Sequence, residues 1–320
     1  MIDDQRSAGA TDRRRDSWFL LVVFLLVSFG GAWLIAMPLW TSGDGLASPL
    51  APLLLPAMMY TPAVAVFAVA LIGRRHPRSF VRDVGMWPLR PLRRVLGLAA
   101  VGIVGAPLLI AAGIVVAVGL GWVHLDLTHL SGFRETLRAA AGDVADAVPL
   151  QLLVVVQLAS IPIGALLNGL LTFGEEVGWR GWLLPWLRTR LGTWPALMVS
   201  GAIWGAWHSP LILLGYDFGR PDASGVLLMV IASVLVGVLF GWLRLRSQSI
   251  WPAVFAHGSL NASANLVVLF SSSAPPVDPT LAGPLGVGTW IASAVLITVL
   301  VLLGQFASAR LTAQRTPSAD

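Results

Sequence analysis

Apolar residues are gathered into eight long runs that short polar segments separate. Each run is long enough for a helix to cross a bilayer, which takes about 20 apolar residues. The pattern predicts an all-α, polytopic membrane helical bundle with about eight transmembrane helices. The runs cover residues 18–40, 50–73, 95–121, 148–174, 194–215, 224–243, 249–270 and 286–307.

The first run follows Arg13, Arg14 and Arg15, as the apolar part of a signal peptide would. It is longer and more continuous than such a part, so we expect a retained membrane helix.

Composition supports a bilayer environment. Of the 320 residues, 56% are hydrophobic and 12% are charged, whereas about 25% are charged in a typical soluble domain. The chain has no cysteine, which excludes a disulfide framework, a thiol nucleophile and a cysteine-ligated metal.

The arginines predict the orientation of the bundle. With the N-terminus in the cytoplasm, alternation of eight spans places 17 arginines on the cytoplasmic side and three, Arg134, Arg138 and Arg220, outside. This bias predicts that both termini are cytoplasmic. The net charge of +5 therefore reflects topology, and we expect no nucleic-acid partner. Because every basic residue is Arg, we expect a bacterial cytoplasmic membrane.

The chain divides into four parts on this interpretation. Residues 1–17 form a cytoplasmic tail, and 18–147 contain the first membrane helices with a helix-capable connection at 122–147. Residues 148–270 form a catalytic helical core. Residues 271–320 hold a Pro/Ser-rich external loop, the last transmembrane helix and a cytoplasmic tail.

Ionisable residues inside the apolar runs are the candidate functional residues. The chain has three glutamates, of which Glu175 and Glu176 are adjacent, and only His208 and His257 of its five histidines fall within the runs. An ionisable side chain at the centre of a membrane helix costs about 2.5–3.5 kcal/mol on insertion scales. Such groups are kept where they have partners or a function.

Helical spacing arranges these residues further. Glu176 and Arg180 stand at i and i+4 and can form an ion pair, whereas Glu175 points about 100° away. His257 and Asn261 share the same spacing on the seventh run, and His208 lies four residues after Trp204 on the fifth.

The chemistry open to this set is limited. A carboxylate beside a neutral imidazole can deprotonate a water, and a second imidazole with an amide can stabilise an oxyanion. Water-driven amide hydrolysis without a covalent intermediate is the favoured interpretation. Glu175, His208 and His257 could alternatively hold a divalent metal such as Zn²⁺, although the sequence has no H-E-x-x-H motif. Ser209 and Ser259 lack a nucleophile elbow.

The three motifs, E-E-x-x-x-R, aromatic-x-x-x-H and H-x-x-x-N, resemble those of the CPBP family of CAAX prenyl endopeptidases and Abi-type or bacteriocin-processing proteins. The resemblance covers about residues 148–270. It implies an intramembrane endopeptidase in which Glu175 activates water with the aid of His208. It further implies that His257 and Asn261 stabilise the oxyanion, and that Glu176 and Arg180 orient the site. The second motif usually begins with Phe, and here it begins with Trp204. Both metal-dependent and metal-free mechanisms belong to the family's description, and we favour the metal-free one.

Other functions fit parts of the pattern. Glu175 and Glu176 could form a simple helix cap, and Glu176–Arg180 could be only a structural ion pair. A proton- or ion-coupled transporter could use the same cluster, but inverted repeats are not apparent. A non-catalytic scaffold is disfavoured because it would have no use for buried charges. We expect a peptide or membrane-associated protein as substrate. Its identity, any prenylation and the oligomeric state are not predicted.

Depth sets one further expectation. Glu175 stands at the end of its apolar run, whereas His208 stands about 20 Å into the next one. The two can meet if the fourth helix continues to about Trp186, or if Pro162 and Pro210 bend their helices. We favour the longer helix, because GWLLPWL is too apolar for an exposed segment.

Overall fold

The computed structural model describes residues 2–311, and it describes side chains from Trp18 onward apart from Asp146. The side chains of Arg6, Arg13, Arg14 and Arg15, and the whole of the predicted tail at 312–320 with Arg315, lie outside the described residues. Within residues 2–311 the fold contains helices and no strand, so the predicted all-α class is confirmed. In chain order the elements are α1 (Ile2–Thr41), η1 (Gly45–Ala47), α2 (Ala51–Met58), α3 (Thr61–Ile72), α4 (Pro77–Asp83), α5 (Leu92–Gly119), α6 (Ser131–Ala141), η2 (Gly142–Ala147), α7 (Leu150–Glu176), η3 (Val177–Leu183), α8 (Leu184–Leu191), α9 (Thr193–Trp207), α10 (Ser209–Ile212), α11 (Ala223–Ser247), α12 (Trp251–Ala262), α13 (Leu266–Phe270), α14 (Pro279–Ala282), α15 (Val287–Leu302) and α16 (Ser308–Leu311).

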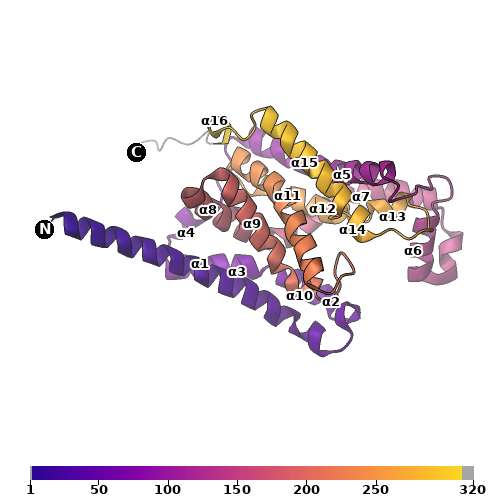
Figure 1. The fold of residues 1–320 in the computed structure, drawn as a ribbon, viewed down its shortest axis with the longest axis horizontal. Coiled ribbons are helices and arrows are strands. Elements are labelled where there is room, and N and C mark those ends of the chain that lie inside the picture. Colours follow the sequence, from indigo (N-terminus) through magenta and orange to yellow (C-terminus); the bar gives the residue numbers. More distant parts are fainter. Residues whose placement is uncertain (1, 312–320) are drawn as a thin grey trace.

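Every predicted apolar run forms helix, but the fifth and seventh runs form no stretch long enough to count as a membrane span. Among the described residues, six helical stretches are long and apolar enough to cross a membrane. The predicted fifth span is divided between α9, of 15 residues, and α10, while the seventh is divided between α12, of 12 residues, and α13. These short helices lie inside the bundle, where α12 packs against α7 and α5, and α9 packs against α11 (Figure 1).

The fourth span is longer than its apolar run. After Glu176 the chain makes a π-helical segment, Val177–Leu183, and continues as α8 to Leu191. Trp179, Leu183 and Leu184 are buried, which explains why so apolar a segment stays in the bundle. The favoured prediction of a longer fourth helix is thereby confirmed.

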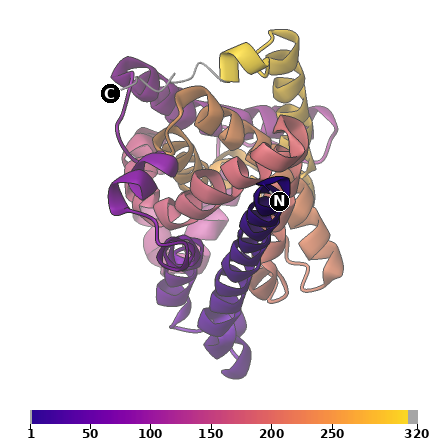
Figure 2. The ribbon, with the colours of Figure 1, turned by 90° about the vertical axis from the view of Figure 1, so that its left-hand side faces the viewer.

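Arginines gather at one end of the bundle. Figure 1 shows α4, α8, α16 and the start of α1 at one end, and α2, α6, α10 and α14 toward the other. Arg94 and Arg246 both donate to the backbone carbonyl of Arg310, at 3.3 and 3.0 Å. Figure 2 views the molecule from this arginine-bearing end. The arrangement agrees with an even number of passes, and the side that this end faces in a cell stays a prediction.

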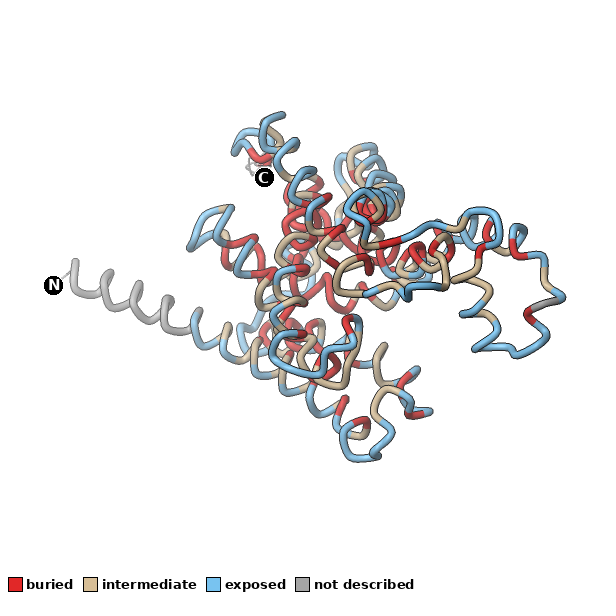
Figure 3. Tube along the Cα trace, turned by 45° about the vertical axis from the view of Figure 1, so that its right-hand side comes forward, coloured by how far each residue is buried: buried red, intermediate tan, exposed pale blue. Residues whose placement is uncertain are grey.

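Close helix contacts through glycine hold the central helices together. A Cβ on Gly205 would lie 2.5 Å from the Cα of Val230, and one on Gly258 would lie 2.3 Å from the carbonyl oxygen of Ala165. Without side chains there, α9 and α11 pack backbone to backbone, as do α12 and α7. Figure 3 shows the buried positions concentrated in the middle of the bundle.

Candidate active site

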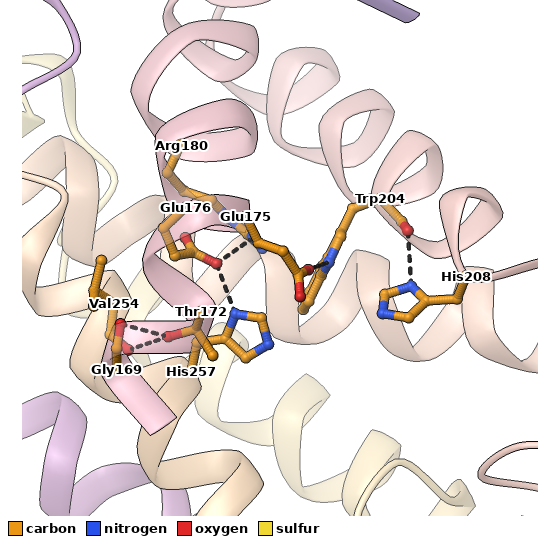
Figure 4. A network of polar contacts seen from close by, with 9 residues as sticks. All are labelled: Gly169, Thr172, Glu175, Glu176, Arg180, Trp204, His208, Val254 and His257. Atoms are coloured by element: carbon orange, nitrogen blue, oxygen red, sulfur yellow. Dashed lines mark hydrogen bonds and ion pairs between the residues drawn. The ribbon is translucent and has the colours of Figure 1, made fainter. Parts of the chain in front are cut away.

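The two adjacent glutamates end α7 and point in different directions, as the helical spacing predicts. Both are buried, with exposed fractions of 2% for Glu175 and 0% for Glu176. Figure 4 shows Glu175 turned toward α9 and Glu176 toward Arg180 and α12. The π-helical segment begins at the next residue, and π-helical turns often occur at functional sites.

Glu176 is the centre of a buried ionic network. Its Oε1 accepts from the guanidinium Nη1 of Arg180 at 2.9 Å, and it also lies 2.9 Å from Nδ1 of His257. The predicted i, i+4 pair is therefore present. The contact from Glu176 to His257, which connects α7 to α12, was not predicted. The Arg180 guanidinium also stacks on Trp204, 4.2 Å from the ring centroid, and lies 5.3 Å from that of Phe240.

Trp204 connects Glu175 to α9. Its indole Nε1 donates to Oε2 of Glu175 at 2.7 Å, and both side chains are buried. The sequence analysis placed Trp204 at the start of its motif, and the hydrogen bond of its indole N–H to Glu175 was not predicted. The described residues make no hydrogen bond to the second oxygen, Oε1, of Glu175.

His208 has its tautomer set by its own helix. Its Nδ1 lies 2.9 Å from the backbone carbonyl of Trp204. A carbonyl only accepts, so Nδ1 carries the proton and Nε2 presents a lone pair. Glu175 stands 16 residues before Leu191, the end of α8, and His208 stands 15 after Thr193, the start of α9. Because the chain reverses direction between α8 and α9, Glu175 and His208 lie at a similar depth in the bundle. The difference in depth that the apolar runs suggested is therefore absent.

A cavity of about 340 Å³ lies against these residues. Four of the predicted site residues line it: Glu175, His208, His257 and Asn261. Glu176 and Arg180 do not line it and lie behind Glu175 and His257. Four of the predicted site residues thus face the cavity, and the other two lie behind them.

The cavity also contains polar residues that the sequence did not single out. Asn168 lines the cavity while its amide donates to the carbonyl of Gly164. Tyr216 and Asp217 reach the cavity from the loop after α10. Asp217 is exposed in this loop and lines the cavity. No spacing rule connects that loop with Glu175, so only the folded chain reveals it.

The alternative metal site requires Glu175, His208 and His257 to converge. Among the described residues, no group of three or more His, Asp or Glu side chains is placed to hold a metal ion. Glu175 and His257 each make a specific hydrogen bond on one side, to Trp204 and Glu176. In this arrangement the residues do not form a metal ligand set, and no step below is assigned to a metal.

The residues of this site lie in a segment that is similar to a known protein family. Residues 151–263 match the family model described as type II CAAX prenyl endopeptidase Rce1-like. This match confirms the resemblance to the CPBP family. The matched residues 151–263 include Glu175, Glu176, Arg180, His208, His257 and Asn261.

A curated relative supports the same assignment. The chain is 28% identical over 114 residues to a protein of Methanococcus maripaludis named CAAX prenyl protease 2. The similarity covers 34% of this chain and 42% of that relative. The chain thus spans less than half the length of the relative that it matches.

Proposed function

We propose that this protein is an intramembrane endopeptidase that hydrolyses a peptide bond with a water activated by Glu175. The observation that carries the proposal is the state of the Glu175 carboxylate. One oxygen is fixed by Trp204 at 2.7 Å, and the residue lines a cavity together with two histidines. A carboxylate held on one side and open on the other is suited to act as a general base.

In the first step, a water in the cavity transfers a proton to Oε1 of Glu175 while its oxygen bonds to the carbonyl carbon. The π electrons of the carbonyl move to its oxygen, which becomes an oxyanion. His208 assists by accepting a hydrogen bond from the water at Nε2, where the tautomer leaves a lone pair. In the second step the oxyanion re-forms the C=O bond, the C–N bond breaks with its electron pair on nitrogen, and the proton held on Glu175 passes to the leaving amine.

His257 and Asn261 are proposed to donate to the oxyanion. The Nδ1 proton of His257 is directed to the Glu176 carboxylate, so donation from Nε2 requires a doubly protonated imidazolium. The charges then balance. Glu175 and Glu176 supply two negative charges, and Arg180 and His257 supply two positive ones, in a region where an uncompensated charge is expensive.

Glu176 and Arg180 are proposed as positioning residues. They do not reach the cavity, but Oε1 of Glu176 holds the ring of His257, and Arg180 packs against the indole that holds Glu175. They thereby support both the base and the oxyanion donor.

The substrate is proposed to be a peptide or a membrane-associated protein. The name of the relative refers to CAAX prenyl proteins, and the same substrate class is a candidate for this chain. An unprenylated peptide is the other candidate. Purified protein should therefore be offered quenched fluorescent peptides with a C-terminal CAAX sequence, with and without the prenyl group.

The test compares Glu175 and His257 with an exposed glutamate of the same chain, Glu135. Glu175→Gln keeps the shape of the side chain but removes the base, and it should lower turnover by about 10²–10⁴-fold. His257→Ala should do the same through loss of the oxyanion donor. Glu135→Gln is the matched control, because Glu135 is exposed on α6 and should keep full activity. Turnover by Glu175→Gln equal to that of the unaltered chain would refute the proposal.

A further inference from the structure

A second cavity, of about 900 Å³, lies at the arginine-bearing end and is separate from the active-site cavity. Residues of α1, α3, α4, η3 and α8 line it. Its inner wall is apolar and includes Leu20, Val66 and Val69, while Arg74, Arg75 and Arg190 line it as well. We propose that this cavity binds one anionic phospholipid, with the phosphate at the arginines and an acyl chain along the apolar wall.

The charge of the lining favours an anion. Among the residues whose side chains the structure describes, three arginines and His76 line the cavity together with one acid, Asp83, whose carboxylate lies 4.0 Å from the Nε of Arg82. Arg74 and Arg75 are exposed. Within the part of the chain that the structure describes, their side chains make no hydrogen bond or ion pair. Guanidinium groups bind phosphate oxygens in bidentate fashion.

The third arginine is already oriented. Arg190 stacks on Trp186 at 3.7 Å from the ring centroid, and its Nη1 donates to the carbonyl of Trp186 at 2.8 Å. Trp186 in turn stacks with Trp182 and meets Trp18 edge to face, with centroids 5.0 Å apart. Tryptophans beside arginines are typical of the headgroup level of a membrane.

The apolar wall distinguishes a lipid from a small anion. A free phosphate would use only the arginines and would leave the aliphatic wall in contact with water. A phospholipid satisfies both parts of the lining, and arginines close to a membrane surface attract anionic lipids. The binding is independent of the proposed peptidase activity.

The cavity also adjoins the active site through the backbone. Gly181 and Trp182 line it and directly follow Arg180 in the π-helical segment. A bound lipid would therefore pack against the segment that positions Arg180 and Glu176, and it should stabilise that segment.

The test is lipid binding to the purified full-length chain, measured by native mass spectrometry after titration with phosphatidylglycerol or phosphatidylcholine. We expect one phosphatidylglycerol to bind at least tenfold more tightly than phosphatidylcholine. The double variant Arg74→Gln/Arg75→Gln should remove this preference. The control Arg90→Gln/Arg93→Gln removes the same charge from exposed positions of the neighbouring segment that do not line the cavity, and it should keep the preference.

Three results would overturn the proposal. An equal loss of the preference for phosphatidylglycerol in the two double variants would indicate diffuse attraction to the whole arginine-bearing end. Equal binding of the two lipids would show that the arginines select no headgroup. Displacement of the lipid by inorganic phosphate at millimolar concentration would indicate a plain anion site. As a second variant, Ala70→Leu places a larger side chain in the apolar part of the cavity. It should weaken the binding of a long-chain lipid more than the binding of a short-chain analogue.

Discussion

The buried ion pair between Glu176 and Arg180 gives the sharpest test of how this site is built. Arg180→Met replaces the guanidinium by an apolar side chain of similar length. Arg180 is 2% exposed and Glu176 is fully buried, with 2.9 Å between Nη1 and Oε1. Removing one partner of a buried pair destabilises a protein by about 3–5 kcal/mol, because the other charge stays buried. His257 still contacts Glu176, so we expect a value near the lower end of about 3–5 kcal/mol.

The partner variant shows whether the loss comes from the unpaired charge. Glu176→Gln/Arg180→Met removes both charges, and the Gln oxygen can still accept from Nδ1 of His257. We expect the double variant to regain at least half of the stability that Arg180→Met loses, because it no longer contains the buried carboxylate of Glu176. The coupling energy between the two sites should then be at least about 1.5 kcal/mol.

Denaturant titration in detergent, followed by the fluorescence of the 14 tryptophans, measures this stability. Arg93→Met is the matched control: Arg93 is exposed, so its replacement should change the free energy of unfolding by less than about 0.5 kcal/mol. The reasoning from an unpaired buried charge fails if the free energy of unfolding of Arg180→Met lies within about 1 kcal/mol of that of the unaltered chain. It also fails if the effects of the two single substitutions add up to the effect of the double variant.

Three further predictions concern the site and its surroundings. Trp204→Phe keeps the ring but loses the donor to Glu175; a hydrogen bond to a charged group contributes about 1.5–3 kcal/mol, so kcat/KM should fall about 10- to 100-fold, and a change below twofold would contradict the role of the indole. Gly258→Ala forces a methyl group to 2.3 Å from the carbonyl oxygen of Ala165 and should destabilise the chain by about 1–3 kcal/mol in a thermal melt, whereas Gly105→Ala, with no atom within 4 Å of its Cβ, should not. In the loop before α6, hydrogen bonds from Ser131 and from the amide of His129 lower the pKa of the Asp126 carboxyl to about 2. Because this folded-state pKa is depressed, the carboxylate's contribution to stability is complete above the ordinary pKa of 3.8 and is lost as pH falls toward about 2. Hydrogen exchange at His129 and Ser131 should accelerate over that range, and the Asp126→Asn variant should lack this response.

The sequence by itself determined the class of protein and most of the site. Apolar runs long enough to cross a bilayer predict helices, because a helix satisfies its backbone hydrogen bonds within its own segment and lipid offers no other partners. The i, i+4 rule then placed Arg180 beside Glu176, and the high cost of buried charge singled out Glu175, His208 and His257. These arguments are local, since they need only the rise and turn of one helix.

Only the tertiary structure decided which groups meet across helices. The hydrogen bond from Trp204 to Glu175, the contact of His257 with Glu176 and the access of Asp217 to the cavity each join segments from different parts of the chain. Periodicity cannot give the rotation of one helix relative to another, which depends on packing such as that of Gly205 against Val230. The fourth helix shows the same division. Its apolar character beyond Glu176 predicted that it continues, but the π-helical segment that follows Glu176 arises where that helix packs into the folded bundle.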